Sequence, residues 1–381
     1  MQGPEILTLS EAVHKYIHPG THILFGGFTL LRRPMALARE IVRQGIGELF
    51  VTMNGGTVVE EMLAGAGLIR WLESTYLGLE GGMPVAYGVR LAIESGEIEL
   101  VEDYSNWSFA LRTVAGRYGL PFMPCLGDLG SDLLEYDSFG RAGLREREKD
   151  GSWKHPGIPP LKYAVIDDPF SGWGLHPRQY RNGPDTCANR TNSYFQPACG
   201  RGPEDNRTWP TAYTGRPGVK VALVPPLLPE VSVIHAQRVA LDGTVRLEGL
   251  PGPDIDQAVC ARVLIVTCER ICRPEELRRT PEQNQIAPHN VTAIVEQPFG
   301  AYPTAVPNYY DYDYAWFQNY TRQVQHRSME AVRGFWRRHV AGTANEWAYL
   351  EQQVGRERLL SLIADADYHY RPDPERRDGG K

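Results

Sequence analysis

The chain has 381 residues, of which 42% are hydrophobic and 23% are charged, and its formal net charge is −6 at pH 7. This composition is ordinary for a folded globular protein and excludes an intrinsically disordered chain. The acidic balance argues against nucleic acid as a partner, because phosphate binding needs a basic surface. The length allows two or three domains, or one large α/β domain with insertions.

Neither end of the sequence nor its cysteines indicate export. The first residues carry no basic segment followed by an apolar stretch, and no apolar run reaches the roughly 18 residues of a spanning helix. Six cysteines occur in a chain of this length, and without a secretory signal they are expected to be reduced thiols. We therefore expect a cytoplasmic protein. The cysteines are Cys125, Cys187, Cys199, Cys260, Cys268 and Cys272.

The first third of the chain alternates short apolar strands with amphipathic helices. Strands are predicted at 23–25, 49–52, 71–77 and 98–101, and helices at 9–17, 34–45, 58–63, 85–93 and 105–118. This order predicts parallel βαβ units. A further strand is predicted to begin at 121–124, and the core pattern is expected to return with strands at 219–224, 231–236, 263–267 and 291–296 and a helix at 254–261.

Two regions depart from this alternation. From about 140 to 217 the periodicity fails and the composition shifts to Pro, Gly, Asn, Arg and isolated aromatic residues, which predicts a long irregular insertion. Such an insertion is either a lid or interface, or a poorly ordered excursion. From about 313 to 370 the sequence is helical and rich in Arg, Glu, Trp and Tyr, and a solvated tail follows it.

Glycine-rich turns follow three of the predicted strands: Gly26-Gly27, Asn54-Gly55-Gly56 and Gly81-Gly82. In open parallel sheets ligands bind beyond the carboxyl ends of the strands, so several backbone amides could converge there. Such a place suits a phosphorylated ligand or an acyl carbonyl that needs oxyanion donors. The alternative is that these glycines serve packing alone.

Other candidate residues each have a structural alternative. Arg32 and Arg33 could hold a carboxylate or phosphate, or could be solvated loop charges. His235 ends an apolar strand and could be a base, although a strand-end histidine is more often structural. The cluster at 309–313 could line a groove, an interface or the surface. No nucleophile elbow, His-Glu-x-x-His or paired-cysteine metal motif occurs, which disfavours hydrolases and zinc enzymes.

Several stretches taken together resemble one family. The chain is similar to the A (α) subunits of family I CoA-transferases, of the glutaconate CoA-transferase type. The resemblance covers nearly the whole chain except about residues 171–214. Its matching stretches are 26–34 (GGFTLLRRP), 102–107 (EDYSNW), 118–124 (YGLPFMP), 231–237 (VSVIHAQ), 242–246 (DGTVR), 266–269 (VTCE), 275–279 (EELRR) and 310–313 (YDYD).

The resemblance implies a single α/β domain over residues 1–381, built on an open, mostly parallel sheet flanked by helices. It implies an enzyme that moves CoA between an acyl-CoA and a small mono- or dicarboxylic acid through a glutamyl-CoA thioester. Coenzyme A is then a substrate, and neither a resident cofactor nor a metal is expected. This chain has Asn54 at the strand end that corresponds to the nucleophilic glutamate, so the resemblance implies that the glutamate lies on a B-type (β) partner. The expected assembly is a heterotetramer.

The resemblance also implies site residues. Asn106 stands where family members often carry an oxyanion-hole glutamine, and its side chain is one methylene shorter. Glu80 is not expected to be a nucleophile. The alternatives are a CoA-thioester decarboxylase, hydrolase or C–C lyase on the same fold, and a non-catalytic CoA-binding protein. The expected substrate or CoA contacts are Gly26, Gly27, Phe28, Thr29, Arg32, Asn54, Gly55, Glu80 and Gly81.

Overall fold

The main sheet is the frame of the molecule in this computed structural model, which describes residues 3–56, 58–78, 85–101, 104–155, 157–169, 220–326, 328–365 and 367–371. Within these residues nine strands form the sheet in the order β1-β12-β11-β9-β2-β3-β4-β5, with β10 beside β9. Every pairing is parallel except that of β10 with β9. The predicted open, mostly parallel sheet is therefore confirmed.

The strand bounds follow the predicted ones closely, and β9 and β11 run longer. They are β1 Glu5–Ile6, β2 His22–Phe25, β3 Leu49–Met53, β4 Ile69–Ser74, β5 Glu99–Leu100, β9 Val231–Ala240, β10 Val245–Arg246, β11 Val263–Cys272 and β12 Ala293–Glu296. The turn predicted at 242–244 joins β9 to β10 as an antiparallel hairpin.

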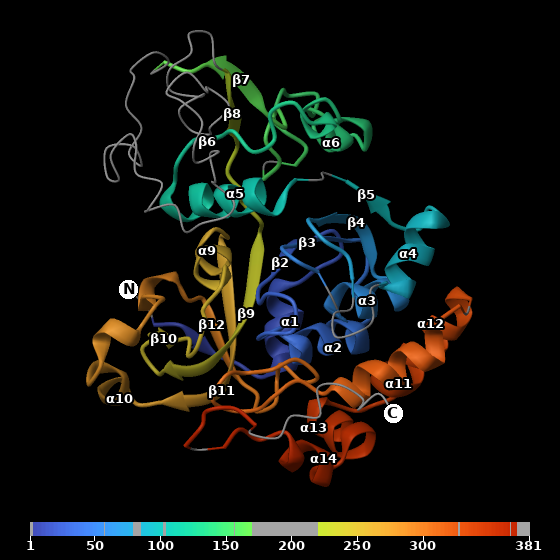
Figure 1. The fold of residues 1–381 in the computed structure, drawn as a ribbon, viewed down its shortest axis with the longest axis vertical. Coiled ribbons are helices and arrows are strands. Elements are labelled where there is room, and N and C mark those ends of the chain that lie inside the picture. The colour runs from blue at the N-terminus through green and yellow to red at the C-terminus, as the bar shows by residue number, and fades with distance from the viewer. Residues whose placement is uncertain are drawn as a thin grey trace, which may run out of the picture.

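Helices cover both faces of this sheet (Figure 1). On one face α1 Leu9–Tyr16, α2 Met35–Gln44, α3 Val58–Gly65 and α4 Tyr87–Glu94 share a large hydrophobic core with β2, β3 and β4. On the other face lie α5 Asn106–Tyr118 and α9 Asp254–Val259. Local chemistry fixes the ends of these helices: Thr8 and Glu11 form a capping box on α1, and Gly119 ends α5 in the left-handed conformation.

The strand register places polar side chains in the middle of the sheet. Thr52 lies opposite Leu24 on one side and Glu73 on the other, so all three side chains face α5. One step towards the amino ends, His22, Phe50 and Trp71 form a second row on the same face.

A small antiparallel sheet forms a separate layer above α5 (Figure 1). It consists of β6 Met123–Cys125, β8 Lys220–Val224 and β7 Ala164–Asp167, in that order. Two predictions are corrected here. The strands at 121–124 and 219–224 do not continue the main sheet, because they pair with each other. The region at 140–217 is not wholly irregular, because β7 lies within it and α6 Ser138–Arg141 overlaps its start. Residues 170–219, with Cys187 and Cys199, lie outside the described residues.

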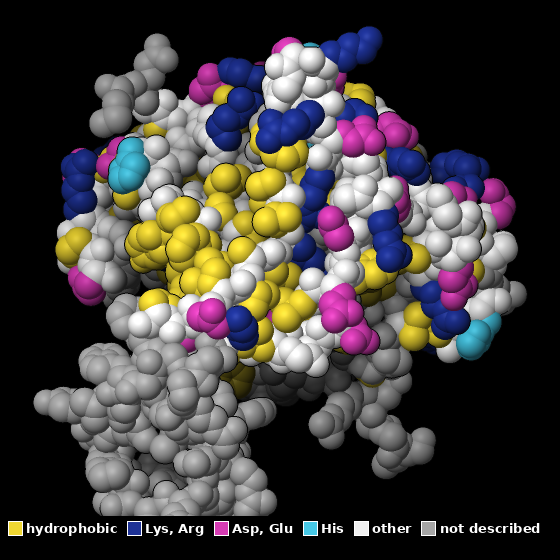
Figure 2. All heavy atoms as spheres, turned by 90° about the horizontal axis from the view of Figure 1, so that it is seen from above, with side chains coloured by type: hydrophobic (Ala, Val, Ile, Leu, Met, Phe, Trp, Pro, Cys, Tyr) yellow, Lys and Arg dark blue, Asp and Glu magenta, His cyan; other side chains and the backbone are white. Residues whose placement is uncertain are grey.

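Hydrophobic side chains gather on the face of the molecule that carries this layer (Figure 2). Leu161, Val165 and Ile166 belong to the layer and are 61%, 48% and 41% exposed. Exposed apolar patches of this kind are typical of surfaces that another chain covers.

The C-terminal helices pack onto the first helices of the chain. Tyr320 donates a hydrogen bond to Glu61 of α3, and Arg39 of α2 pairs with Glu346, both side chains of that pair being 1% exposed. Gly65 is required here, because a Cβ atom at this position would lie 2.3 Å from the indole of Trp336. These helices are α11 Tyr314–Val324, α12 Met329–Trp336, α13 Glu346–Tyr349 and α14 Arg356–Ser361, with π-helical turns at Arg337–Ala341 and Leu350–Val354. The short helix α10 Pro274–Arg278 lies elsewhere, where its Leu277 packs against the ends of β9 and β11.

The described residues show neither a membrane span nor a metal site. None of their helices combines the length and the apolar character that crossing a bilayer requires. They contain no group of three or more His, Cys, Asp or Glu side chains placed to hold a metal ion. The four described cysteines, which are Cys125, Cys260, Cys268 and Cys272, are buried free thiols.

Candidate active-site edge of the sheet

The structure brings two of the predicted glycine turns together at the carboxyl ends of β2 and β3. We call this region the carboxyl edge: residues 26–31 after β2, 54–56 after β3, 75–77 after β4, and Asn106 at the start of α5. The amide of Gly55 donates to the Thr75 hydroxyl at 3.1 Å, and the amide of Gly56 donates to the carbonyl of Tyr76 at 2.9 Å. Glu80 and Gly81, predicted as contacts, lie outside the described residues.

Glycine is needed at the turn that follows β2. A Cβ atom on Gly26 would lie 2.6 Å from Cγ2 of Ile234, so the close approach of β2 to β9 excludes a side chain. Gly27 has a φ of 82°, which L-residues rarely adopt, and a Cβ atom there would lie 2.5 Å from the carbonyl oxygen of Leu31. The two glycines therefore fit the turn for local steric reasons.

A buried carboxylate on α9 fixes this turn. Asp254, the first residue of α9, accepts hydrogen bonds from the amide of Gly27 at 2.5 Å and from Nε of Arg32 at 2.7 Å. Both charged side chains are 1% exposed. Burial raises the pKa of the Asp254 carboxyl, and the neighbouring Arg32 guanidinium opposes that rise. The pair ties the turn to α9.

Arg32 does not lie on a ligand surface, contrary to the prediction from sequence. Besides Asp254, its guanidinium donates to the carbonyls of Leu250 at 2.7 Å and Pro251 at 3.0 Å. A guanidinium has five N–H donors, and the donors of this buried side chain form hydrogen bonds within the protein. The physical reason is the position of α9, which the sequence around Arg32 does not reveal.

Arg33 is also directed inward. It donates to the carbonyls of Thr29 at 3.1 Å, Gly26 at 3.2 Å and Asn54 at 3.3 Å, and to that of Gly55. One side chain thus binds both glycine turns together. The interpretation of the two arginines as an anion-binding pair is wrong, and so is the alternative of solvated loop charges, because Arg33 is fully buried.

The backbone amides of the glycine turns are already used within the fold. Gly26 donates to Val233 at 2.8 Å, and Phe28 donates to Leu31 at 3.1 Å. The amides of Gly27, Gly55 and Gly56 donate as described above. A converging set of free backbone donors, which was the expectation from sequence, is therefore not present at these positions. Side chains are therefore considered as donors to a ligand at these two turns.

Asn106 supplies such a side chain. It is exposed, and as the first residue of α5 it is held by the Ser105 cap, whose hydroxyl accepts from the amide of Ser108 at 3.1 Å. The Thr75 hydroxyl contacts the Asn106 carboxamide oxygen and lies 3.0 Å from Oδ1 of Asn54. Among the described residues, Nδ2 of Asn106 has no hydrogen-bond partner.

The remaining predicted contacts differ in exposure. Asn54 is 4% exposed and Gly55 is buried, so these two residues pack inside the edge and do not form its surface. Thr29 is half-buried with a φ of 50°, a strained value for a β-branched residue. Phe28 is 36% exposed, and its ring covers Gly55, where a Cβ atom would lie 2.9 Å away. Phe28 and Asn106 are thus the exposed members among those residues of the predicted set that the structure describes.

Three residues of the edge were missed by the sequence analysis. Tyr76 follows Thr75 and Trp107 follows Asn106 in the chain, and these two aromatic side chains are 42% and 61% exposed. Thr75 links the two asparagines. The only signal for these residues was their place directly after a strand or at a helix start, which is also where packing residues occur.

The other candidates from the sequence are structural. His235 is fully buried and hydrogen-bonds to Thr267 at 2.8 Å and to Glu269 at 2.7 Å. Tyr310 donates to the same Glu269 at 2.7 Å, and Asp313 caps α11 through the amide of Trp316. These groups belong to the buried support of β9 and α11, so His235 has the structural role that the sequence favoured.

Together, the parallel sheet and this edge define an α/β protein of the kind that binds ligands beyond the carboxyl ends of its strands. The sequence profile of the coenzyme A transferase family matches residues 6–297. The chain therefore belongs to the coenzyme A transferase family, and its relatives identify it as an enzyme subunit of the A (α) type.

Two curated relatives and two solved structures support this assignment. The A subunit of glutaconate CoA-transferase from Acidaminococcus fermentans is 30% identical over 98% of this chain and 99% of that protein. The A subunit of 3-oxoadipate CoA-transferase from Pseudomonas knackmussii is 27% identical, over 82% and 86% of the two chains. The crystal structure of glutaconate coenzyme A-transferase from A. fermentans matches with a TM-score of 0.75, covering 97% of this chain and 98% of that one. The decarboxylase AibA/AibB, at 21% identity, shares the fold with a TM-score of 0.60, over 88% of this chain and 99% of that one.

Proposed function

We propose that this chain forms one half of a shared active site in which a B-type partner carries the nucleophile. The complex moves CoA between an acyl-CoA and a small mono- or dicarboxylic acid. Asn54 occupies the strand end where the nucleophilic glutamate of the partner type is expected, and a carboxamide cannot form the acyl anhydride. The exposed Asn106 carboxamide, with Nδ2 unpaired among the described residues, is the single observation that carries the proposal.

The proposed reaction needs an oxyanion donor in each step. The partner's carboxylate attacks the thioester carbonyl, and the CoA thiolate leaves to give a mixed anhydride. The thiolate then attacks the glutamyl carbonyl, releases the first acid as a carboxylate and leaves a glutamyl-CoA thioester; the second acid reverses these steps. Every attack places negative charge on a carbonyl oxygen, which a positioned N–H donor stabilises.

Asn106 is the proposed donor, and Thr75 positions it. A hydroxyl has one proton, and we assign the proton of Thr75 to Oδ1 of Asn106, so that Nδ2 is directed away from Thr75. We propose that the acyl-CoA lies along the carboxyl edge, where the exposed ring of Phe28 covers Gly55. Gly26, Gly27 and Gly55 set the shape of this edge without donating to the ligand.

The role of Asn106 is tested with the copurified heteromeric complex and a panel of acyl-CoAs. We expect Asn106→Ala to lower kcat by about 100-fold, the usual effect of removing one oxyanion donor. Asn106→Gln should retain much more activity, since it keeps the carboxamide. Asn319→Ala, an exposed asparagine on α11, is the matched control. Equal activity of Asn106→Ala and Asn319→Ala would refute the role.

The division of labour between the chains is tested by trapping. Borohydride or hydroxylamine added during turnover should modify a glutamate on the partner only. Modification of this chain would overturn the proposal. Light scattering of the complex should give the mass of two A-type and two B-type chains. The cytoplasmic location stays a prediction from the sequence.

The alternative is a CoA-thioester decarboxylase, hydrolase or C–C lyase. The observation that favours it is the shorter Asn106 side chain, which moves the donor by about one carbon–carbon bond from the position of a glutamine amide. The acyl-CoA panel separates the two functions, because a transferase consumes the acceptor acid in equal amounts with the acyl-CoA, whereas the alternatives act without an acceptor.

A further inference from the structure

A hollow separate from the carboxyl edge lies on the sheet face under the small antiparallel layer. It has a volume of about 480 Å³ and is lined from the sheet by His22, Phe50 and Trp71. Leu144, His155 and Ile158 cover it from one side, and residues 228–230, which lead into β9, border it from the other. Phe50 precedes Asn54 by four residues, so the hollow lies about 13 Å from the carboxyl edge along β3. We call it the His22 pocket.

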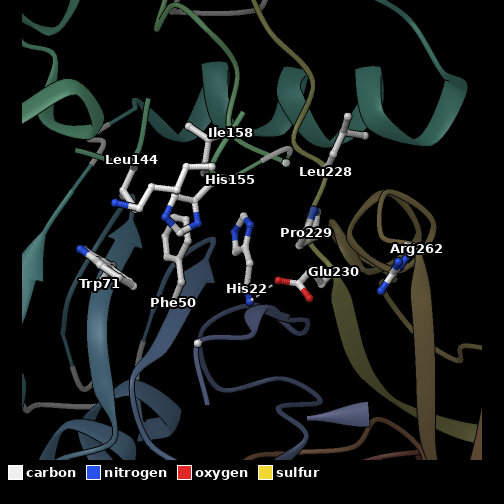
Figure 3. Close-up of a pocket in the computed structure, with 13 residues that line it drawn as sticks. His22, Phe50, Trp71, Leu144, His155, Ile158, Leu228, Pro229, Glu230 and Arg262 are labelled. Atoms are coloured by element: carbon white, nitrogen blue, oxygen red, sulfur yellow. Dashed lines mark hydrogen bonds between the residues drawn. The ribbon is translucent and has the colours of Figure 1, made fainter. Parts of the chain in front are cut away.

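Aromatic rings make the floor and one wall of the His22 pocket. The rings of His22 and Phe50 are stacked with centroids 4.0 Å apart and planes 7° apart, and His155 meets Trp71 edge-on at 6.1 Å. Figure 3 shows the rings of His22, Phe50 and His155 gathered in the pocket, with the Glu230 carboxylate beside His22. Flat aromatic surfaces of this kind suit a planar ring.

A chain of buried hydrogen bonds connects His22 to Thr52 and Glu73. Glu73 pairs with Arg112, both side chains being 1% exposed, so its carboxylate has no proton to donate. We assign the Thr52 proton to Glu73, at 3.2 Å, so that the hydroxyl accepts from Nε2 of His22, at 2.8 Å. Nδ1 of His22 is left as a bare acceptor.

This acceptor is accessible from the pocket, although most of the His22 side chain is buried. His22 is 6% exposed, and its Nδ1 has no hydrogen-bond partner among the described residues. The exposed Glu230 adds a second acceptor, whose Oε1 lies 3.3 Å from the backbone amide of His22. Burial lowers the pKa of His22 to about 3, so the ring is neutral near pH 7 and presents a lone pair.

Two cations border the same pocket. Lys154 is paired with Glu146 at 3.2 Å and is 48% exposed, and Arg262 is exposed. Within the described part of the chain, the Arg262 guanidinium has no hydrogen-bond or ion-pair partner. It is therefore available to bind an anion.

We propose that the His22 pocket binds a planar amino-heterocycle that carries an anionic tail, of which an adenosine phosphate is the example. The ring lies in the plane of His22 and parallel to Phe50, its N–H groups donate to Nδ1 of His22 and to Glu230, and the phosphate pairs with Arg262. Free nucleotides and the nucleotide end of CoA share this chemistry. The proposal does not depend on whether the complex is a transferase.

The probe is AMP, titrated into the copurified heteromeric complex and followed by isothermal calorimetry. Glu230→Gln should weaken AMP binding about tenfold, the usual effect of losing one charged hydrogen-bond acceptor. Leu228→Trp, at the mouth of the pocket, should abolish it. The matched controls are Glu148→Gln and Leu241→Trp, exposed residues outside the pocket, and neither should change the affinity. Adenosine should bind more weakly than AMP if Arg262 holds the phosphate.

The outcomes separate the proposal from its alternatives. Loss of AMP binding on adding CoA, with the same sensitivity to Leu228→Trp for both ligands, assigns the pocket to the nucleotide end of CoA. Simultaneous binding of AMP and CoA assigns it to a free nucleotide. Absence of saturable AMP binding, or binding that Leu228→Trp leaves unchanged, overturns the proposal. Acyl-CoA turnover is measured in parallel, so failure here is distinct from failure of the proposed function.

Discussion

The buried pair of Asp254 and Arg32 gives the most direct test of how the carboxyl edge is held. Asp254→Asn keeps the shape of the side chain and one acceptor for the Gly27 amide. It removes the negative charge that faces a guanidinium only 1% exposed to solvent. Breaking one side of a buried ion pair usually destabilises by about 3–5 kcal/mol, because the other charge stays buried without compensation.

The structure moves the expected value to the lower end of that range. In Asp254→Asn, Arg32 still donates to the carbonyls of Leu250 and Pro251, which partly solvate the charge. We therefore expect a loss of about 3 kcal/mol in the free energy of unfolding. Urea unfolding of the purified chain, followed by tryptophan fluorescence, measures this loss. Activity of the complex should fall as well, since the Gly27 turn is no longer tied to α9.

The same helix offers a matched control. Asp256 pairs with Arg117 at 2.8 Å, but these side chains are 27% and 29% exposed, so Asp256→Asn should cost less than about 1 kcal/mol. Adding Arg32→Met to Asp254→Asn should recover part of the loss, because no unpaired charge remains. Equal losses of unfolding free energy for Asp254→Asn and Asp256→Asn would refute the reasoning. A loss in the double variant that exceeds the summed losses of Asp254→Asn and Arg32→Met would also refute it.

Three further predictions concern the edge and its support. Thr75→Val should lower transferase activity at least about tenfold and Thr75→Ser should restore it, because only the hydroxyl positions Asn106; equal activity of the two variants would contradict this. His22 is neutral when folded, with a pKa of about 3 against an ordinary value of 6.5, so the unfolded chain binds its proton first as the pH falls. The free energy of unfolding should thus decrease by about 2 kcal/mol from pH 7 to pH 5 through this residue, and His22→Gln should flatten that slope. Gly26→Ala should destabilise by about 1–3 kcal/mol through its contact with Cγ2 of Ile234, and Ile234→Leu, which removes that branch at Cβ, should relieve part of the loss if that contact is the cause.

Much of the fold could be predicted because it is encoded locally. The apolar run ending at Phe25, the glycine pair after it and the helix ending at Gly45 each report on neighbouring residues only. Their alternation is sufficient to predict parallel strands, since each crossover contains a helix. The small layer could not be predicted in the same way, because β6 pairs with β8 about a hundred residues later and nothing in either strand identifies its partner.

The site was only partly predictable for the same reason. The sequence placed Asn106 and Phe28 near a ligand, and the structure exposes both at the carboxyl edge. It could not show that Arg32 and Arg33 turn inward, because the carboxylate and carbonyls that bind them come from Asp254 and from a second strand end.

The sequence by itself therefore determined the order of strands and helices, the positions of the glycine turns and the family, since these depend on local steric and hydrophobic patterns. Only the tertiary structure decided which polar groups are used up within the fold and which remain available. The amides of the two described glycine turns and both arginines form hydrogen bonds within the edge, whereas Nδ2 of Asn106 and Nδ1 of His22 are left without partners among the described residues. That distinction depends on contacts between distant segments. It separates the residues that stabilise the fold from those that are available to bind a ligand.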